Sequence, residues 1–433
     1  MYYFIGIKGS GMSALAAILF DLGYEVKGSD IDKHFFTETG LIERGIEILP
    51  YNKDNIQEGM TIVCGNAIKE DHEELIRARE LDLTIHTYPE IVGKLSRMFK
   101  TITVAGCHGK TSTTSLLAHV LNTISGANYL IGDGTGHANK ENKYFALEAC
   151  EYQRHFLAYS PYYAIITNIE LDHVDYFKDI DDVIDAYREY ASNAEKMVLA
   201  CGDDPYTHSL DINKPIFYYG LDDDNDIIAK DVEYSKNGTS FDVFVEDNYY
   251  GHFDLPIFGK HQLLNALAVI GVCSYERLDA KEVAKALKTF TGAKRRFSET
   301  IIGDTIIIDD YAHHPTEVKV TIKAAMQKYE GKEIVVVFQP HTFSRMKEFF
   351  DDYVEVLSMA SKAYIMEIHG SREKAEDFDV TSGDLIKKVK NSESINIDEA
   401  EKLVKHKNSV ILFMSPNDIS KLENEYINLL NEE

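Results

Sequence analysis

The sequence predicts an α/β protein of three domains, each built on a doubly wound, mainly parallel sheet. Short apolar runs alternate with helical patterns in three successive series, and such alternation is typical of parallel sheets covered by helices. Two glycine-rich turns, each between a strand and a helix, open the first two series. From the breaks between the series we expect domains over residues 1–97, 98–294 and 295–433.

The elements follow from hydrophobic periodicity. In the first series we expect strands over 2–7, 25–30, 61–67 and 83–88, with helices over 11–24 and 72–82. The second series has expected strands over 101–106, 144–150, 163–169 and 197–202. Residues 215–255 are rich in Tyr and Phe, alternate, and contain the turn "KNG", which predicts a small antiparallel insertion before helices over 261–278 and 280–290. Strands over 305–311, 333–340, 362–368 and 409–415 make up the third series.

Composition excludes several classes of function. The 433 residues carry a net charge of −26, which argues against nucleic acid or an anionic membrane surface as the main partner. The five cysteines form no C-x-x-C pair, so we expect reduced thiols in a cytoplasmic protein. The chain begins directly with a strand pattern and has no apolar run of membrane-spanning length, so we expect neither a signal peptide nor a membrane segment.

The first glycine turn ends the first strand and opens a helix. Its spacing is G-x-x-G-x-G, which differs from the dinucleotide pattern G-x-G-x-x-G, so NAD does not follow. Glycines and a helix N-terminus let the backbone approach a diphosphate, and a carboxylate after the next strand can bind a ribose hydroxyl. The candidate residues are Gly6, Lys8, Gly9, Ser10, Gly11 and Asp30. A tight turn without a ligand remains the alternative.

The second turn, in "ITVAGCHGKTSTTSLLAHVL", has the form of a phosphate-binding loop but is two residues shorter than G-x-x-x-x-G-K-[ST]. Lys110 would neutralise the outer phosphates, backbone amides would surround them, and the Thr111 hydroxyl would bind Mg²⁺. The candidate loop comprises Gly106, Cys107, His108, Gly109, Lys110, Thr111 and Ser112. The position of Cys107 inside this loop also suggests sensitivity to oxidants.

Acidic and histidine residues follow the next strands of the same series. Glu148 and Glu151 end one strand, and Glu170, Asp172 and His173 follow another. Because parallel strands bring their carboxyl ends to one edge of a sheet, these groups can hold the Mg²⁺ of a nucleotide. Taken singly, an exposed strand end or a paired turn histidine explains each of them equally well.

Four further patterns are candidates for binding. His261 and Asn265 share a helix face, where they would read a base or hydrogen-bond within the helix. Arg295 and Arg296 lie at the predicted domain junction, where a solvated linker is the alternative. The polar run Asp309, Asp310, Tyr311, His313 and His314 directly follows a buried strand, and one strand later His341 and Arg345 repeat the pattern. Polar groups at such positions are costly unless a ligand uses them.

The motifs "GCHGKTST", "EACE", "TNIELDH", "HQLLNALA", "AKRRF", "DDYAHHPTE" and "FQPHTFSR", in this order, resemble those of the Mur ligases of peptidoglycan synthesis. With the N-terminal "FIGIKGSGMSALA" and "GSD", the resemblance covers essentially the whole chain. It implies a Rossmann-like UDP-binding domain, a P-loop ATPase-like central domain and a Rossmann-like C-terminal domain for the amino acid. A loop of the form G-x-x-G-K-[ST] is normal in that family.

The resemblance also implies roles for single residues. The expected ATP-binding residues are the 106–112 loop with His261, Asn265, Arg296 and Asp310, and the first glycine turn with Asp30 would bind UDP. Thr111 and Glu148 would hold a first Mg²⁺ and His173 a second. His313 and Arg345 would face the muramate carboxylate and the incoming amino acid. The expected catalytic residues are therefore Lys110, Glu148, His173, His313 and Arg345. Some relatives carry a second arginine where this chain has Thr342, so the amino-acid contacts are expected to be arranged differently here.

The implied reaction joins L-alanine to the lactyl carboxylate of UDP-N-acetylmuramate, with ATP and Mg²⁺ as cofactors, in a monomer or weak dimer. One alternative within the family attaches a recycled tripeptide to the same UDP-sugar. Alternatives of other classes are a nucleotide-sugar oxidoreductase, suggested by the N-terminal glycines, and a non-catalytic UDP-sugar sensor. The Lys110 loop has no use in hydride transfer, and a sensor is expected to have lost the metal and phosphate residues that are present here.

Overall fold

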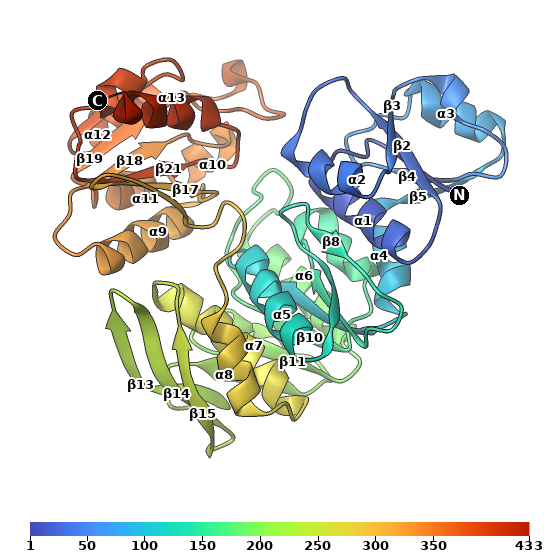
Figure 1. The fold of residues 1–433 in the computed structure, drawn as a ribbon, viewed down its shortest axis with the longest axis horizontal. Coiled ribbons are helices and arrows are strands. Elements are labelled where there is room, and N and C mark those ends of the chain that lie inside the picture. The colour runs from blue at the N-terminus through green and yellow to red at the C-terminus, as the bar shows by residue number, and fades with distance from the viewer. Residues whose placement is uncertain (433) are drawn as a thin grey trace.

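The computed structural model describes residues 1–432 and contains three sheets, one in each of three bodies arranged around a common centre (Figure 1). This confirms the predicted three-domain α/β architecture. The chain passes from the first sheet to the second after β5 and from the second to the third after α8. The boundaries at residues 97 and 294 stay predictions.

The N-terminal sheet has five parallel strands in the order β3-β2-β1-β4-β5, the arrangement expected of a Rossmann-like domain. Its short strands β1 and β4 lie in the middle and are mostly buried, whereas the four-residue β3 and β5 are half-exposed edges. The elements are β1 (Tyr2–Ile5), α1 (Ser10–Asp21), β2 (Val26–Asp30), α2 (Thr39–Glu43), β3 (Glu47–Pro50), β4 (Thr61–Cys64), α3 (Glu73–Glu80), β5 (Thr84–Thr87) and α4 (Tyr88–Ser96).

The central sheet is mixed and has ten strands in the order β15-β14-β13-β12-β11-β10-β6-β9-β7-β8. Strands β10, β6 and β9 are adjacent and parallel, so the residues that follow them meet at one edge, as predicted. The elements are β6 (Lys100–Ala105), α5 (Lys110–Ser125), β7 (Ala127–Leu130), β8 (Gly136–His137), β9 (Tyr144–Glu148), β10 (Tyr163–Ile166), α6 (Ile180–Ser192), β11 (Met197–Cys201), β12 (Ile216–Gly220), β13 (Ile227–Ser235), β14 (Gly238–Val245), β15 (Asn248–Leu255), α7 (Lys260–Tyr275) and α8 (Ala280–Lys288).

The expected antiparallel segment is the meander β13–β14–β15, which extends the central sheet as its outer edge (Figure 1). The strand before it, β12, runs parallel to both β11 and β13, although it falls within the stretch predicted to be antiparallel. Alternation of side chains identifies a half-buried strand but does not fix its direction. The pattern therefore could not predict whether β12 runs parallel or antiparallel to its neighbours.

The C-terminal sheet has the order β16-β17-β21-β18-β19-β20, with only the edge strand β16 antiparallel to its neighbour. Its inner strands β17, β18 and β21 are almost fully buried between helices. The elements are β16 (Ser298–Ile302), β17 (Thr305–Asp310), α9 (Pro315–Lys328), β18 (Ile334–Phe338), α10 (Phe343–Glu348), α11 (Phe350–Leu357), β19 (Lys362–Ile365), α12 (Ser382–Lys388), β20 (Ser392–Ser394), β21 (Val410–Met414) and α13 (Ser420–Asn431).

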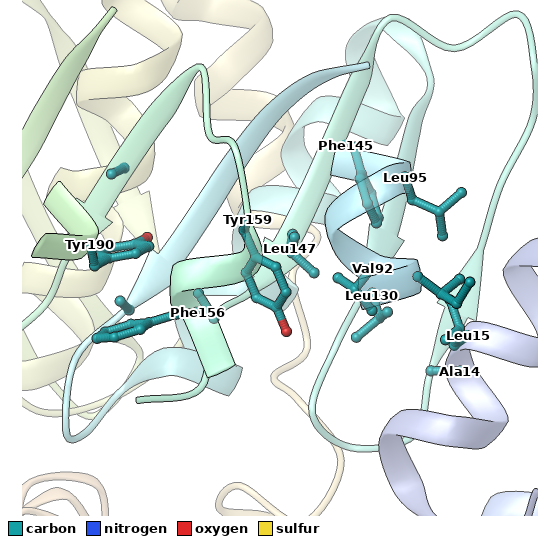
Figure 2. Packing of buried hydrophobic residues seen from close by; sticks show 14 of the residues in the cluster. Ala14, Leu15, Val92, Leu95, Leu130, Phe145, Leu147, Phe156, Tyr159 and Tyr190 are labelled. Carbon is teal, nitrogen blue, oxygen red and sulfur yellow. The ribbon is translucent and has the colours of Figure 1, made fainter. Parts of the chain in front are cut away.

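The N-terminal and central domains share one apolar core. Leu15 of α1 and Val92 and Leu95 of α4 belong to the same buried cluster as Phe145 and Leu147 of β9 (Figure 2). Gly93 allows α4 to approach closely, because a Cβ at this position would lie 2.4 Å from the carbonyl oxygen of Ala158. The two domains are therefore joined by hydrophobic packing.

The apolar cores of the C-terminal domain are separate from those of the other two domains, since both of its buried clusters contain only residues from 297 onwards. Ion pairs and hydrogen bonds, described below, link it to the central domain. Among residues 1–432, no helix has the length and apolar character needed to cross a bilayer.

Candidate active site

The loop between β6 and α5 is shaped by its glycines. Gly106 has φ +140°, and a Cβ there would lie 1.9 Å from Thr167 Oγ1; Gly109 has φ +81°, with Asn265 Oδ1 only 2.9 Å from its Cβ position. The Thr167 hydroxyl donates to the carbonyl of His108 at 2.6 Å, which ties the loop to the end of β10. The loop thus turns tightly. The N-terminus of the 16-residue helix α5 points towards the concave side of this loop.

Lys110 bends back over this loop. Its Nζ donates to the carbonyls of Gly106 at 2.6 Å and Cys107 at 3.1 Å and lies 2.9 Å from Glu151 Oε1. Burial opposes the charge of Lys110, but the Glu151 carboxylate outweighs it and raises the lysine pKa, so the ammonium is charged at neutral pH. A buried cation on a phosphate-binding loop suits the outer phosphates of a nucleotide.

Oxygen atoms that can act as metal ligands lie next to the Lys110 loop. Glu148 Oε1 accepts a hydrogen bond from the Thr111 hydroxyl at 3.1 Å, and its Oε2 accepts from the Gly132 N–H at 2.7 Å. Burial raises the pKa of Glu148, and Glu151 Oε2 is buried without a partner among the described residues. His173, at φ +50°, places Nε2 3.5 Å from Glu151 Oε1. The Thr111 hydroxyl and the Glu148 carboxylate, which has no ion pair among the described residues, fit Mg²⁺.

Arg345 of α10 reaches across to the central domain. Its Nη2 and Nε lie 2.7 Å and 3.1 Å from Asp172 Oδ1, and each side chain is only 7% exposed. Burial opposes ionisation of Asp172, but the Arg345 guanidinium holds its pKa well below the usual range. The result is a buried, fully ionised pair that bridges two domains.

A second bridge joins the phosphate loop to α9. His108 Nε2 lies 3.0 Å from Glu170 Oε2, and His108 Nδ1 lies 3.3 Å from Glu317 Oε1 of the C-terminal domain. Burial opposes a charge on His108, yet the two carboxylates raise its pKa to about 10. The Thr316 hydroxyl also donates to Glu170 at 2.8 Å. The loop is therefore linked to the C-terminal domain by a charged imidazolium.

One ring nitrogen of His313 lies close to two hydrogen-bond acceptors. Its Nδ1 lies 3.1 Å from both Glu317 Oε2 and the carbonyl oxygen of Tyr311, and both of these atoms only accept hydrogen bonds. The Nδ1 atom therefore carries the proton, which leaves Nε2 as a proton acceptor. His313 lines the main cavity described next.

All three domains contribute to one cavity of about 600 Å³. The N-terminal turn supplies Ser10, and the nearby Phe36 adds an aromatic side chain. The central and C-terminal residues that line it include Cys107, Gly109, Lys110, Thr111, Glu148, Tyr152, Asp172, His173, Lys294, Arg295, Arg296, His313, His341, Thr342, Arg345 and Arg372. The structure thus brings the predicted phosphate, metal and C-terminal candidates together.

A smaller cavity of about 310 Å³ lies behind the loop. It is lined by His108, Gly109, Ser112, His261, Asn265, Arg296 and Asp310, together with apolar side chains such as Phe258 and Phe297. Burial and the charge of Arg296 lower the pKa of His261 to about 4, so this imidazole is neutral. A partly apolar pocket beside a phosphate loop, with the neutral imidazole of His261 in its wall, has the character of a nucleobase site.

The structure does not bring most of the N-terminal candidates to the main cavity. Asp30 accepts hydrogen bonds from the backbone N–H groups of Lys8 at 2.7 Å and Ile31 at 2.8 Å, and the Lys8 ammonium is paired with Glu38 at 2.9 Å. Of the predicted turn residues, only Ser10 lines the cavity. Asp30 therefore holds the turn in shape, a role that strand-end position alone did not indicate.

Cys107 differs from the oxidant-sensitive group suggested by its position. The thiol is buried, its Sγ donates to the Glu170 carbonyl oxygen at 2.9 Å, and burial raises its pKa well above the ordinary value. Because the thiolate is the reactive form, Cys107 is an inert structural thiol. The suggestion of redox sensitivity is thus not supported by the environment of this residue.

Sequence reasoning missed several groups of the site. Glu317, which contacts both His108 and His313, had a readable signal, because "HPTE" places proline and glutamate at the first turn of a helix. Tyr152 and Arg372 line the main cavity without belonging to any recognisable pattern.

The fold and the site together define an enzyme that uses a nucleotide between three domains. Three family models match successive parts of the chain: "Mur ligase family, catalytic domain" over residues 1–100, "Mur ligase middle domain" over 104–273 and "Mur ligase, glutamate ligase domain" over 295–417. The chain belongs to the Mur ligase family. It is therefore a peptide-forming ligase of a family that uses ATP and Mg²⁺ with UDP-sugar and amino-acid substrates.

Solved structures agree with this assignment. UDP-N-acetylmuramate-alanine ligase MurC from Thermotoga maritima is 27% identical over 100% of this chain and 99% of its own, with a TM-score of 0.82. A murein peptide ligase from Psychrobacter arcticus shares the fold at 22% identity over 100% and 99% of the two chains, with a TM-score of 0.74. MurF from Thermotoga maritima, solved in complex with ADP, shares it at 17% identity over 94% and 95%, with a TM-score of 0.64.

Proposed function

We propose that this protein is a UDP-N-acetylmuramate–L-alanine ligase, which attaches the first amino acid of the peptidoglycan peptide. The observation that carries the proposal is the shared cavity of about 600 Å³, in which the phosphate loop and acidic groups of the central domain face His313 and Arg345 of the C-terminal domain. The 27% identity to MurC of Thermotoga maritima over the whole chain supports the choice of alanine.

The first step would transfer the γ-phosphoryl group of ATP to the lactyl carboxylate, which gives an acyl phosphate and ADP. Catalysis of such a transfer is mainly positioning and neutralisation of charge. Lys110 and the amides of the 106–112 loop would hold the triphosphate, with the base in the smaller cavity beside His261 and Asn265. Thr111, Glu148 and His173 would hold Mg²⁺, which supplies positive charge to the phosphates when bound.

Groups at the domain junction would complete the nucleotide site. Arg296 lines both cavities, and Asp310, which lines the smaller one, accepts hydrogen bonds from the N–H groups of Phe297 and Ala312 at 2.8 Å each. These bonds fix the backbone directly after Arg296 and the loop that follows β17. Arg296 would then add a positive charge at the phosphates in a protein whose net charge is −26.

In the second step the amine of L-alanine would attack the acyl carbon and form the C–N bond, and the tetrahedral intermediate would then break its C–O bond to phosphate and expel it. The amine must lose a proton, which His313 Nε2 is free to accept because Nδ1 is engaged with Glu317 and the Tyr311 carbonyl. Arg345, held by Asp172, would face the carboxylate groups of the substrates.

The test is ATP- and Mg²⁺-dependent release of phosphate with UDP-N-acetylmuramate, comparing L-alanine with the L-Ala-γ-D-Glu-diamino-acid tripeptide. Release with alanine is expected. Release only with the tripeptide would make the protein a recycling ligase, and no release with either would favour a sensor. His313→Gln should lower the rate about 100-fold or more at neutral pH, and restoration of that rate by added imidazole would support the role of a base.

A further inference from the structure

Most positive side chains of the main cavity already have an anionic partner. The pairs are Lys110 with Glu151 at 2.9 Å, Arg345 with Asp172 at 2.7 Å, Arg295 with Asp309 at 3.1 Å and Arg296 with Glu317 at 3.7 Å. Two cations that line the cavity, Arg372 and Lys294, form no ion pair within residues 1–432. Before any ligand binds, these two are therefore the cations of the cavity that no carboxylate of the described residues pairs with.

Arg372 is held in place by the turn that carries Arg345. The backbone of His369 pairs with that of His341, and its N–H donates to the Pro340 carbonyl at 2.9 Å. Glu373, next to Arg372, accepts a hydrogen bond from the Ser344 N–H at 3.0 Å. The loop after β19 and the start of α10 therefore form one unit, and the exposed Arg372 of this unit lines the same cavity as Thr342 and Arg345.

The side chain of Arg372 crosses to the central domain. Its Nη1 donates to the Tyr152 hydroxyl at 3.4 Å, and its guanidinium lies 5.9 Å from the centre of the Tyr152 ring. The other side of this contact is His173, whose ring centroid is 4.8 Å from that of Tyr152. Arg372 is thus placed next to the end of the cavity that holds His173 and Arg345, whereas Lys294 lies on the linker before Arg295.

The chemistry of the ligand follows from this position. A free amino acid carries a carboxylate on the carbon next to its amine, and a planar guanidinium matches a carboxylate through two parallel hydrogen bonds. The Arg345 charge is compensated by the buried Asp172, so it offers less to a second anion. Among residues 1–432, the Arg372 guanidinium has a hydrogen bond only to the Tyr152 hydroxyl, which itself donates to Asp175 at 3.0 Å, so Arg372 has no direct carboxylate partner.

We propose that Arg372 binds the α-carboxylate of the incoming amino acid and makes the enzyme select a free amino acid over an amine that lacks this group. This inference rests on the proposed function, since it assumes that alanine is the acceptor. It also predicts that the amine of the same molecule lies towards the acyl group and within reach of His313 Nε2.

The experiment measures phosphate release with ATP, Mg²⁺ and UDP-N-acetylmuramate while L-alanine or L-alaninamide is varied. The wild-type protein is expected to favour alanine by about 10- to 100-fold in kcat/KM, because a hydrogen bond to a charged group is worth about 1.5–3 kcal/mol. In Arg372→Met the KM for alanine should rise by about the same factor, the preference over alaninamide should disappear, and the KM values for ATP and UDP-N-acetylmuramate should hold. Arg372→Lys should restore part of the preference.

The matched control is Lys374→Met, on the same loop, whose ammonium contacts Glu376 at 3.8 Å and does not line the cavity; it should leave every constant unchanged. An unchanged KM for alanine and an unchanged preference in Arg372→Met would overturn the proposal, as would transfer of both effects to Lys294→Met. Equal use of alanine and alaninamide by the wild-type protein would overturn it without any variant. Failure of the proposed function is seen separately, as a wild-type protein that releases phosphate with the tripeptide but not with alanine.

Discussion

Replacing Asp172 by asparagine removes the negative half of a buried ion pair between two domains while keeping the size of the side chain. The Arg345 guanidinium then has no carboxylate at 2.7 Å and remains in a site that is 7% exposed. Breaking a buried pair in this way costs about 3–5 kcal/mol, because one charge stays desolvated without compensation. Because the pair bridges two domains, we expect the cost to appear as easier separation of the C-terminal domain, since opening returns Arg345 to water.

The magnitude can be read from amide hydrogen exchange of α10 by mass spectrometry. A loss of about 3 kcal/mol, the lower end of the range, corresponds to an opening equilibrium about 100-fold larger and to exchange faster by the same factor. The pKa of Asp172 is held well below its usual value, so its contribution is fully present above about pH 4 and is lost only as the pH falls through the folded pKa. The difference between wild type and variant should therefore be constant between about pH 6 and pH 8.

Two further variants make the test specific. Glu355→Gln breaks the exposed contact between Lys319 and Glu355 at 3.1 Å in the same domain and should leave exchange of α10 unchanged. The double variant Asp172→Asn/Arg345→Met removes both charges and should recover most of the loss, because a buried pair can be replaced by neutral groups at little cost. Exchange that is unaffected in Asp172→Asn, or equally fast in the double variant, would refute the argument.

Three other predictions concern single groups. Lys110→Met should lower phosphate release about 100- to 1000-fold; a variant of near wild-type rate would remove the lysine from the phosphate site. Burial raises the pKa of Asp310 to about 6 from 3.8, so the folded protein binds this proton more tightly than the unfolded chain and loses stability as the pH rises from about 4 to 6. The Asp310→Asn variant does not lose stability in this way. The free energy of unfolding of the variant, measured in urea and compared with that of wild type, should therefore rise by about 3 kcal/mol between pH 4 and pH 7. A difference that stays the same over this range would contradict the raised pKa. Because its thiol is buried with a raised pKa, Cys107 should react with iodoacetamide only after unfolding. Rapid alkylation of the native protein that ATP prevents would show the opposite.

The parts of the fold that could be predicted are those whose cause is local in sequence. The loop at 106–112 was recognisable because strand, glycines and helix are contiguous in the chain, although the contacts that require the glycines, with Thr167 and Asn265, are distant in sequence. Strand β3 was not expected, since four half-exposed residues at a sheet edge show no alternation. Helix α4 was also not expected, although Thr87, Pro89 and Glu90 form a capping box with proline in the first turn.

The candidate site could be predicted in its separate pieces but not in its connections. Asp172 and Arg345 are 173 residues apart in the chain, and Glu170 and Thr316 are 146 apart, so no spacing rule links them. Charged groups of this kind also pair freely on protein surfaces, which makes composition uninformative about which partner each one takes. The partners of Arg345 and Arg372 depend on how two domains dock, and this information lies in the tertiary structure.

The contrast between the two domain seams has a consequence for turnover. Hydrophobic packing of α1 and α4 holds the N-terminal domain against the central domain. The C-terminal domain is instead attached by the ion pairs of His108 and Arg345. In each catalytic cycle the site must open for substrates to enter and products to leave. We expect the central and C-terminal domains to separate, because ion pairs hold them together. We therefore expect the rate of product release to depend on these few ion pairs, with which anionic substrates and products in the cavity compete.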